Sequence, residues 1–310
     1  MDSSFSSDSN DFLSIFKEID NIELDTNWEK SLKVFMLQID SKDFDYLSLK
    51  EKLLDPILWY SLSRRTLSEY KWVSVSAVKK ATSKIRDYLS NTWELWEYLL
   101  YCFLESDLQA PKILSKLELK TSPNDYVKWA DWVHIKKIWD DYVLLFWESK
   151  TIIQLKKWID SALLSIYDFK NWIKRNKEWV ETDRDTSKFW IWYEKALISD
   201  NLWKETFTEE KEKFFKSLIY PSRENSCNVN TGFAIFIWFE IDISKFQNLS
   251  NVEFSNKLEE VLKEKINKKK DYILEEIKTK NLQWHNLYFY FLPFSRLNET
   301  REEITKHITT

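Results

Sequence analysis

Residues 130–150 read ADWVHIKKIWDDYVLLFWESK, and this stretch is the part of the sequence that decides the expected fold. Two runs, 127–138 and 142–150, have the length and the apolar alternation that are typical of β-strands. Between them, Trp139 and Asp140 fit the two-residue loop of a tight hairpin, in which glycine would be a favoured first residue. The sequence therefore predicts a β-hairpin whose tip lies at these two residues.

Three polar side chains of this hairpin form a candidate metal site. Counting outward from the loop pairs Asp131 with Glu148 on the neighbouring strand, which puts their Cβ atoms roughly 5 Å apart. Side chains alternate along a strand with period two, so Lys150 lies on the same face as Glu148. Two carboxylates this close raise the pKa of one of them unless a cation lies between them.

A hard divalent cation such as Mg²⁺, or Mn²⁺ in its place, takes carboxylate oxygens as ligands and activates a bound water. A lysine beside it can orient that water or stabilise charge on a phosphate. We therefore predict Asp131, Glu148 and Lys150 as catalytic residues. The alternative is an ordinary cross-strand arrangement in which Lys150 is only a counter-ion.

The Glu-x-Lys spacing alone carries little information, because it recurs at residues 69–71, 118–120, 209–211 and 276–278. The copy at 148–150 differs because it ends an apolar strand and has an aspartate paired with it. His134 falls on the face opposite to Asp131 by alternation, so we expect a structural histidine there rather than a ligand.

Helical and strand-like segments alternate along the rest of the chain, which predicts an α/β fold. Expected helices cover 75–105, 152–168, 253–279 and 298–307, and expected strands cover 113–120, 232–243 and 286–292, the last ending at Pro293. Residues 1–10 are rich in Ser and Asp and are expected to be disordered. We expect an N-terminal accessory region at 11–75 and one main domain at 76–310.

Charge and cysteine content exclude several classes of protein. A net charge of −4 argues against a generic basic nucleic-acid binder, although local phosphate contacts remain compatible with it. The two cysteines, Cys102 and Cys227, form no CxxC pair, which favours a reducing compartment over a disulfide framework. Apolar runs are too short to span a bilayer and the N-terminus does not read as a signal peptide. We expect a cytoplasmic protein without membrane contact.

Glycine and tryptophan usage is anomalous. The chain has one glycine, Gly232, and 17 tryptophans, whereas average usage predicts roughly 22 glycines. Turns need residues that tolerate positive φ, which bulky side chains rarely do. We hypothesise a reassigned codon, UGA, that encodes glycine and has been translated as tryptophan. The prediction is that such tryptophans lie at turns and crowded backbone sites, with Trp139 at the hairpin tip, Trp172 in a loop or helix end and Trp147 crowding the face opposite the site. The alternative is a truly Trp-rich protein.

With glycine read at the suspect positions, several motifs resemble the HamA family, the nuclease subunit of Hachiman anti-phage defence systems. Residues 94–100 are similar to its Gly-Glu-x-Leu-Leu helix, and residues 129–135 and 147–150 resemble its Gly-x-Asp-x-x-His and Gly-Glu-x-Lys elements. Residues 111–120 and 285–293 resemble its connecting and closing strands. The resemblance covers roughly residues 85–310 and leaves the N-terminal third unmatched.

The resemblance implies a restriction-endonuclease-like fold of the PD-(D/E)XK class and a metal-dependent DNA nuclease in antiviral defence. It also implies that Glu97, on a helix, joins Asp131 and Glu148 as a metal ligand, against the alternative of a surface glutamate. DNA and a HamB-type helicase subunit are the implied partners. Basic clusters at 156–157, 174–175 and 268–270 could contact DNA, although charged helix faces are usually only solvated. The competing hypothesis is a catalytically silent adaptor or regulator that binds a partner helicase or nucleic acid.

Overall fold

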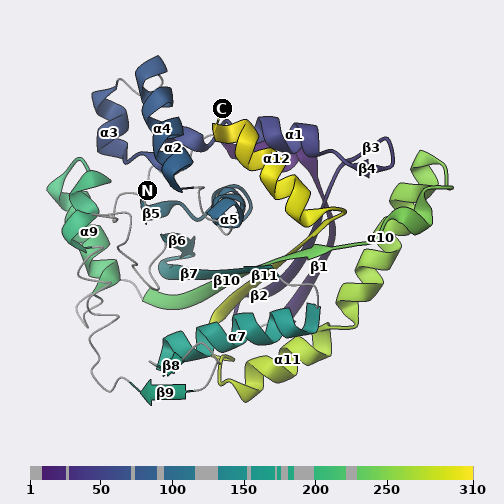
Figure 1. The fold of residues 1–310 in the computed structure, drawn as a ribbon. Helices are drawn as coiled ribbons and strands as arrows, with labels where there is room; N and C mark the ends of the chain where they lie inside the picture. Colours follow the sequence, from purple (N-terminus) through teal and green to yellow (C-terminus); the bar gives the residue numbers. More distant parts are fainter. Residues whose placement is uncertain are drawn as a thin grey trace.

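A central mixed β-sheet with helices on both faces organises the molecule (Figure 1). The computed structural model describes residues 9–25, 28–70, 74–88, 94–115, 132–151, 155–171, 173–175, 181–184, 199–220 and 229–309. Within them the seven-stranded sheet has the order β1-β2-β11-β10-β7-β6-β5. The predicted α/β class is confirmed, whereas the narrower restriction-endonuclease-like class stays a prediction.

The middle of the sheet is parallel and its two edges are antiparallel. β10 pairs in parallel with both β7 and β11, and β11 pairs in parallel with β2. β1 joins β2, and β6 joins β7 and β5, in antiparallel register. The strands are β1 (Phe16–Asp25), β2 (Lys30–Leu37), β5 (Lys112–Ser115), β6 (Trp132–Ile138), β7 (Asp141–Thr151), β10 (Val229–Glu240) and β11 (Asn286–Phe294). Strands β10 and β11 are almost wholly apolar because both of their faces are covered by helices.

The predicted hairpin is confirmed. β6 and β7 pair from His134↔Leu145 to Ile138↔Asp141, which is the register that the sequence predicts. Trp139 lies at the tip with a φ of 55°, and its side chain is 91% exposed. The hairpin thus has the turn that glycine would favour, with a tryptophan in its place.

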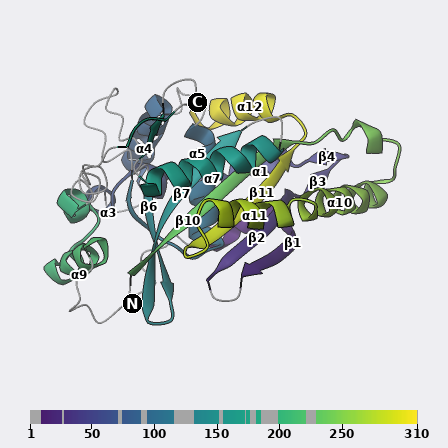
Figure 2. The same cartoon turned by 90° about the horizontal axis from the view of Figure 1, so that it is seen from below.

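Two helices lie directly on opposite faces of the sheet (Figures 1 and 2). α5 (Glu94–Ser106) covers one face, where the ring of Phe103 lies 4.9 Å from that of Phe236. α7 (Leu155–Asn171) covers the other, where the ring of Phe169 lies 5.0 Å from that of Phe146. Alternate residues of β7 and β10 therefore belong to different layers of the core.

Further helices complete the two layers. On the α5 side lie α1 (Tyr46–Lys52), α2 (Ile57–Ser61), α3 (Arg64–Glu69), α4 (Val75–Tyr88) and α12 (Leu297–Thr309). On the α7 side lie α10 (Asn251–Asn267) and α11 (Lys270–Thr279), and α11 packs against α7. The remaining elements are α9 (Glu209–Ile219), the 3₁₀ helices η1 (Ser9–Ile15), η2 (Leu202–Lys204) and η3 (Ser244–Phe246), and the short strands β3 (Ile39–Asp40), β4 (Asp43–Phe44), β8 (Ile173–Arg175) and β9 (Glu181–Arg184).

Three predicted elements differ from those observed. The single helix expected at 75–105 is two helices with different partners, since α4 packs on α2 and α12 whereas α5 packs on the sheet. The helix expected at 253–279 divides into α10 and α11. β11 continues through Pro293, where a proline one residue before the strand end removes at most one hydrogen bond of the ladder.

The N-terminal region is part of the central sheet rather than a layer added to it. β1 and β2 extend the sheet beyond β11, and the buried Val34–Leu37 segment of β2 belongs to the main core. The expected boundary near residue 75 therefore does not separate two sheets.

The one glycine stands where there is little room for a side chain. Gly232 lies in β10 between Leu145 of β7 and Asn286 of β11. A Cβ atom at this position would lie 2.7 Å from Cγ1 of Val143 and 2.9 Å from Cδ2 of Leu145. Those two side chains close over the glycine, so the strands meet there without a void.

The described tryptophans range from exposed to fully buried. Trp139, Trp203 and Trp284 are exposed, and Trp139 has the positive φ expected of a glycine site. Trp96, Trp158 and Trp238 are fully buried in helices or strands, and the rings of Trp96 and Trp238 lie 5.1 Å apart. At these three positions the prediction that such residues avoid the core is wrong. Trp147 is partly buried against the main core, and Trp172 lies outside the described residues.

We predict that Trp139→Gly stabilises the protein by about 1 kcal/mol, because it removes a bulky residue from the left-handed region and exposes no core. Trp158→Gly is the matched control and should cost about 3–5 kcal/mol, since it empties a packed position. Urea unfolding of the two variants measures both changes. A loss of stability in Trp139→Gly comparable to that of the control would contradict the glycine interpretation of position 139.

Candidate functional site

Two of the predicted catalytic residues lie near the carboxyl end of β7. The backbone of Glu148 pairs with Ile235 and that of Lys150 with Ile237, both in β10. Asp131 immediately precedes β6 and lies outside the described residues, as do the side chains of Glu148 and Lys150. The proximity of the three groups therefore stays a prediction, based on the hairpin register.

The ladder that leads to these positions is regular. β7 and β10 pair without a shift from Tyr142↔Val229 to Thr151↔Trp238. In an unbroken strand, positions 146, 148 and 150 share one side of the sheet. Phe146 packs against α7, so these positions belong to the α7 side.

Glu97 lies on α5, which covers the other side of the sheet. The neighbouring Trp96 packs against Trp238, and Trp238 pairs with Thr151 at the end of β7. The start of α5 is thus level with the carboxyl end of β7. Glu97 is half-buried there. Because Glu97 and position 148 lie on opposite sides of the sheet, a metal ion shared by the two would have to lie beyond the carboxyl end of β7. Its role as a ligand stays a prediction.

His134 has the environment of a structural histidine. Its ring is fully buried, packs beside Tyr101, and donates from Nδ1 to the carbonyl oxygen of Ala110 over 2.7 Å. Burial lowers the pKa of His134 to about 4, so the imidazole is neutral near pH 7. A neutral, buried ring on the α5 side agrees with the expectation that His134 is not a ligand.

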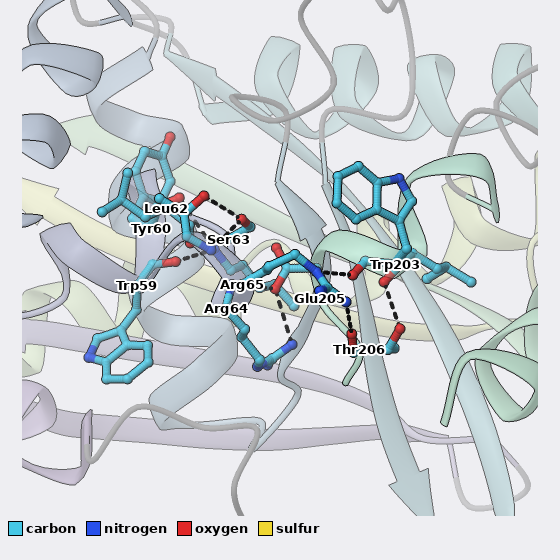
Figure 3. A network of polar contacts seen from close by, with 12 residues as sticks. Trp59, Tyr60, Leu62, Ser63, Arg64, Arg65, Trp203, Glu205 and Thr206 are labelled. Atoms are coloured by element: carbon cyan, nitrogen blue, oxygen red, sulfur yellow. Dashed lines mark hydrogen bonds and ion pairs between the residues drawn. The ribbon is translucent and has the colours of Figure 1, made fainter. Parts of the chain in front are cut away.

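A buried polar network anchors the segment around η2 beside the hairpin (Figure 3). Arg64 and Glu205 form an ion pair at 3.4 Å, and the backbone N–H of Arg64 donates to the same carboxylate over 3.2 Å. Arg65 donates to the carbonyl oxygens of Trp203 and Thr206 over 3.0 and 3.1 Å. These contacts join the first turn of α3 to a segment about 140 residues later in the chain, so no local sequence signal points to them.

A second pair of charged residues lies next to this network. Lys112 is buried, and its ammonium group donates to the carbonyl oxygens of Trp59, Tyr60 and Leu62 at the end of α2. Its backbone N–H donates to Oε1 of Glu105 over 2.7 Å. Lysine thus satisfies the carbonyl groups that a helix leaves open at its C-terminus. Sequence reasoning placed Lys112 in a family motif but assigned it no role.

The polar network holds in place the segment of η2 and α9 that covers the hairpin. Leu202, the first residue of η2, packs in one cluster with Val133, Ile135 and Leu144 of the hairpin. Phe215 of α9 completes that cluster. The Arg64–Glu205 ion pair therefore holds an apolar cover on the hairpin strands that lead to the predicted site.

Within the described residues, no group of three or more His, Cys, Asp or Glu side chains is arranged to hold a metal ion. Of the predicted ligands, Asp131 and the side chain of Glu148 lie outside the described residues. The carboxylate-only donor set is chemically suited to Mg²⁺ or Mn²⁺, which prefer oxygen ligands.

We predict that Glu105 makes the stability of the protein depend on pH. Burial raises the pKa of Glu105 from 4.5 to about 7, so the folded state holds this proton more tightly than the unfolded chain does. The resulting stabilisation is complete below pH 4.5 and is lost as the pH rises through about 7. Glu105→Gln, which cannot ionise, should therefore gain on the order of 2–3 kcal/mol relative to the parent protein between pH 5 and pH 8. Urea unfolding across this range tests it, and a difference that does not change with pH would contradict it.

Comparison with known proteins gives a family match. Among the described helices, none combines the length and the apolar character that a membrane span requires. No curated protein matches the chain. A family model described as HamA matches residues 10–308. This match includes the N-terminal third, which the resemblance of individual motifs did not reach, and it agrees with the place of β1 and β2 in the central sheet. The chain belongs to the HamA family.

Proposed function

We propose that this protein is a metal-dependent DNA nuclease that hydrolyses phosphodiester bonds as the effector of an antiviral defence system. The observation that carries the proposal is the register of the β6–β7 hairpin, from His134↔Leu145 to Ile138↔Asp141. Continued for three more pairs beyond His134↔Leu145, the same register would place Asp131 opposite Glu148. Membership of the HamA family supports the same role, since its motifs are those of the nuclease subunit of Hachiman systems.

The proposed ligands are Asp131 and Glu148, with Glu97 as a third candidate. Mg²⁺, or Mn²⁺, would polarise the phosphate and lower the pKa of a bound water when present. Two carboxylates at this separation would repel one another, and a cation bound between them would relieve that repulsion. Lys150, two residues after Glu148 on the same strand, orients the attacking water or binds a non-bridging phosphate oxygen.

A partner subunit is part of the proposal. Unwinding of DNA requires nucleotide hydrolysis, and the sequence contains no GxxxxGK[ST] motif for binding the phosphates of a nucleotide. A HamB-type helicase subunit would supply that activity, and the nuclease would cut the DNA that the helicase engages. A role in Hachiman defence is consistent with the family to which the chain belongs.

The second candidate function is a catalytically silent adaptor that binds a helicase or nucleic acid. The observation that favours it is the bulk beside the predicted site, where Trp147 precedes Glu148 and Trp132 follows Asp131. Trp147 packs against the main core, so it occupies space that the glycine of the family motif would leave free. The codon at each position and an activity assay discriminate between the two functions.

We predict that Glu148→Ala and Lys150→Ala each reduce Mg²⁺-dependent nicking of plasmid DNA by at least a hundredfold, because each removes a group that acts on the transition state. The assay uses protein with glycine at positions 132 and 147, alone and with its helicase partner. Glu276→Ala and Lys278→Ala are matched controls from a Glu-x-Lys pair on α11 and should keep full activity.

Unchanged nicking in Glu148→Ala or Lys150→Ala would remove that residue from the mechanism. Absence of nicking in the parent protein, with and without the partner, under conditions in which it binds that partner would favour the adaptor.

A further inference from the structure

Lysines gather near the carboxyl end of β10, next to the predicted catalytic end of β7. Lys150 pairs with Ile237, and Phe239 follows two residues later in β10, roughly 7 Å further along the strand. The ammonium group of Lys265, from α10, lies 4.9 Å from the centre of the Phe239 ring. A cation from a distant helix therefore lies near the carboxyl end of β10, two residues beyond the position that pairs with Lys150.

The start of α7 brings more lysines to the same edge. The ammonium group of Lys156 lies 4.6 Å from the centre of the Tyr272 ring in the first turn of α11. The hydroxyl group of Tyr272 donates to Asp160, one turn further along α7. These contacts fix the N-terminal ends of α7 and α11 side by side, which Figures 1 and 2 both show.

We propose that five lysines at these ends form a DNA-binding surface, the basic ridge, which contacts phosphates flanking the bond that is cut. The basic ridge consists of Lys156, Lys157, Lys265, Lys269 and Lys270. It joins three segments that are separate in sequence: the start of α7, the end of α10 and the start of α11. The inference rests on the proposed nuclease function, and it adds the path of the substrate.

The charges of the basic ridge are available to a ligand. In the part of the chain that the structure describes, none of the five lysines has a carboxylate within ion-pair distance, whereas the adjacent Lys268 is paired with Glu264 at 2.5 Å. Lys156 and Lys157 are exposed, and the other three are half-buried. Lys265 is half-buried, and burial lowers its pKa, as expected where the stem of a lysine is partly covered by the protein.

DNA fits this surface better than an acidic protein segment does. The whole chain has a net charge of −4, so a run of four lysines at 265–270 with no acidic residue among them is a local exception. Lysines act as point charges that bind the regularly spaced phosphates of a backbone without reading sequence. Such contacts would suit a nuclease that positions DNA irrespective of its bases.

The test measures DNA binding separately from cleavage. All variants carry Glu148→Ala, and binding of a fluorescein-labelled DNA duplex to the full-length protein is followed by anisotropy over a series of NaCl concentrations. The ridge variants are Lys156→Glu/Lys157→Glu and Lys269→Glu/Lys270→Glu. The matched control is Lys79→Glu/Lys278→Glu, which changes the same charge at exposed positions of α4 and α11 away from the basic ridge.

Each ridge variant should weaken binding at least tenfold and reduce the slope of log K against log salt by about 2, because two phosphate contacts are lost. The control should remain within twofold of the parent. Lys269→Gln/Lys270→Gln, which adds no repulsion, should show the same reduction in slope. Thermal unfolding confirms that each variant is folded.

The basic ridge would be contradicted if the ridge variants bind DNA like the control, or if the parent binds no DNA. Loss of binding to the helicase partner with unchanged DNA binding would also contradict it, and would identify an acidic protein as the occupant. The proposed nuclease function has an outcome of its own. If Mg²⁺-dependent cleavage is absent but the ridge variants lose DNA binding, the basic ridge is supported and the nuclease function is contradicted.

Discussion

Strand β7 is hydrogen bonded along both edges, and its two ladders determine the layout of the molecule. On one side it pairs with β6 in antiparallel register, and on the other it pairs with β10 in parallel register from Tyr142 to Thr151. A shift of one residue in either ladder would move every side chain of β7 to the opposite layer of the core. The packing of Phe146 on α7 opposes such a shift, as does the lack of room for a side chain at Gly232, which pairs with Leu145.

The two ends of β7 have different surroundings as a result. Near its amino end, η2 and α9 cover the hairpin, held by the ion pair of Arg64 with Glu205 and by apolar contacts of Leu202. At its carboxyl end, β7 leads into α7, and the lysines of three helices gather around the end of the neighbouring β10. A rigid scaffold that presents polar groups at one edge of a sheet is expected to have this arrangement.

The hairpin could be predicted from sequence because its information is local: two apolar runs, a two-residue loop and period-two alternation. The long-range contacts could not. Nothing in the sequence near Arg64 points to Glu205, and the pairing of β2 with β11 joins segments from opposite ends of the chain. The break between α4 and α5 was missed because apolar spacing alone does not show that two helices have different partners. For the site, period-two alternation predicts from the sequence that positions 148 and 150 share one side of the sheet, whereas the place of Glu97 on the other side follows only from the packing of α5.

The most direct test of the account is whether positions 131 and 148 face each other. Asp131→Cys and Glu148→Cys, introduced together in protein in which Cys102 and Cys227 are replaced by Ser, place two thiols on directly opposed positions of the hairpin. Mild oxidation followed by mass spectrometry of the digested protein should find a disulfide between 131 and 148, and little between 131 and 147 in the matched pair Asp131→Cys/Trp147→Cys. Preferential formation of the 131–147 disulfide would contradict the register on which the proposed metal site depends.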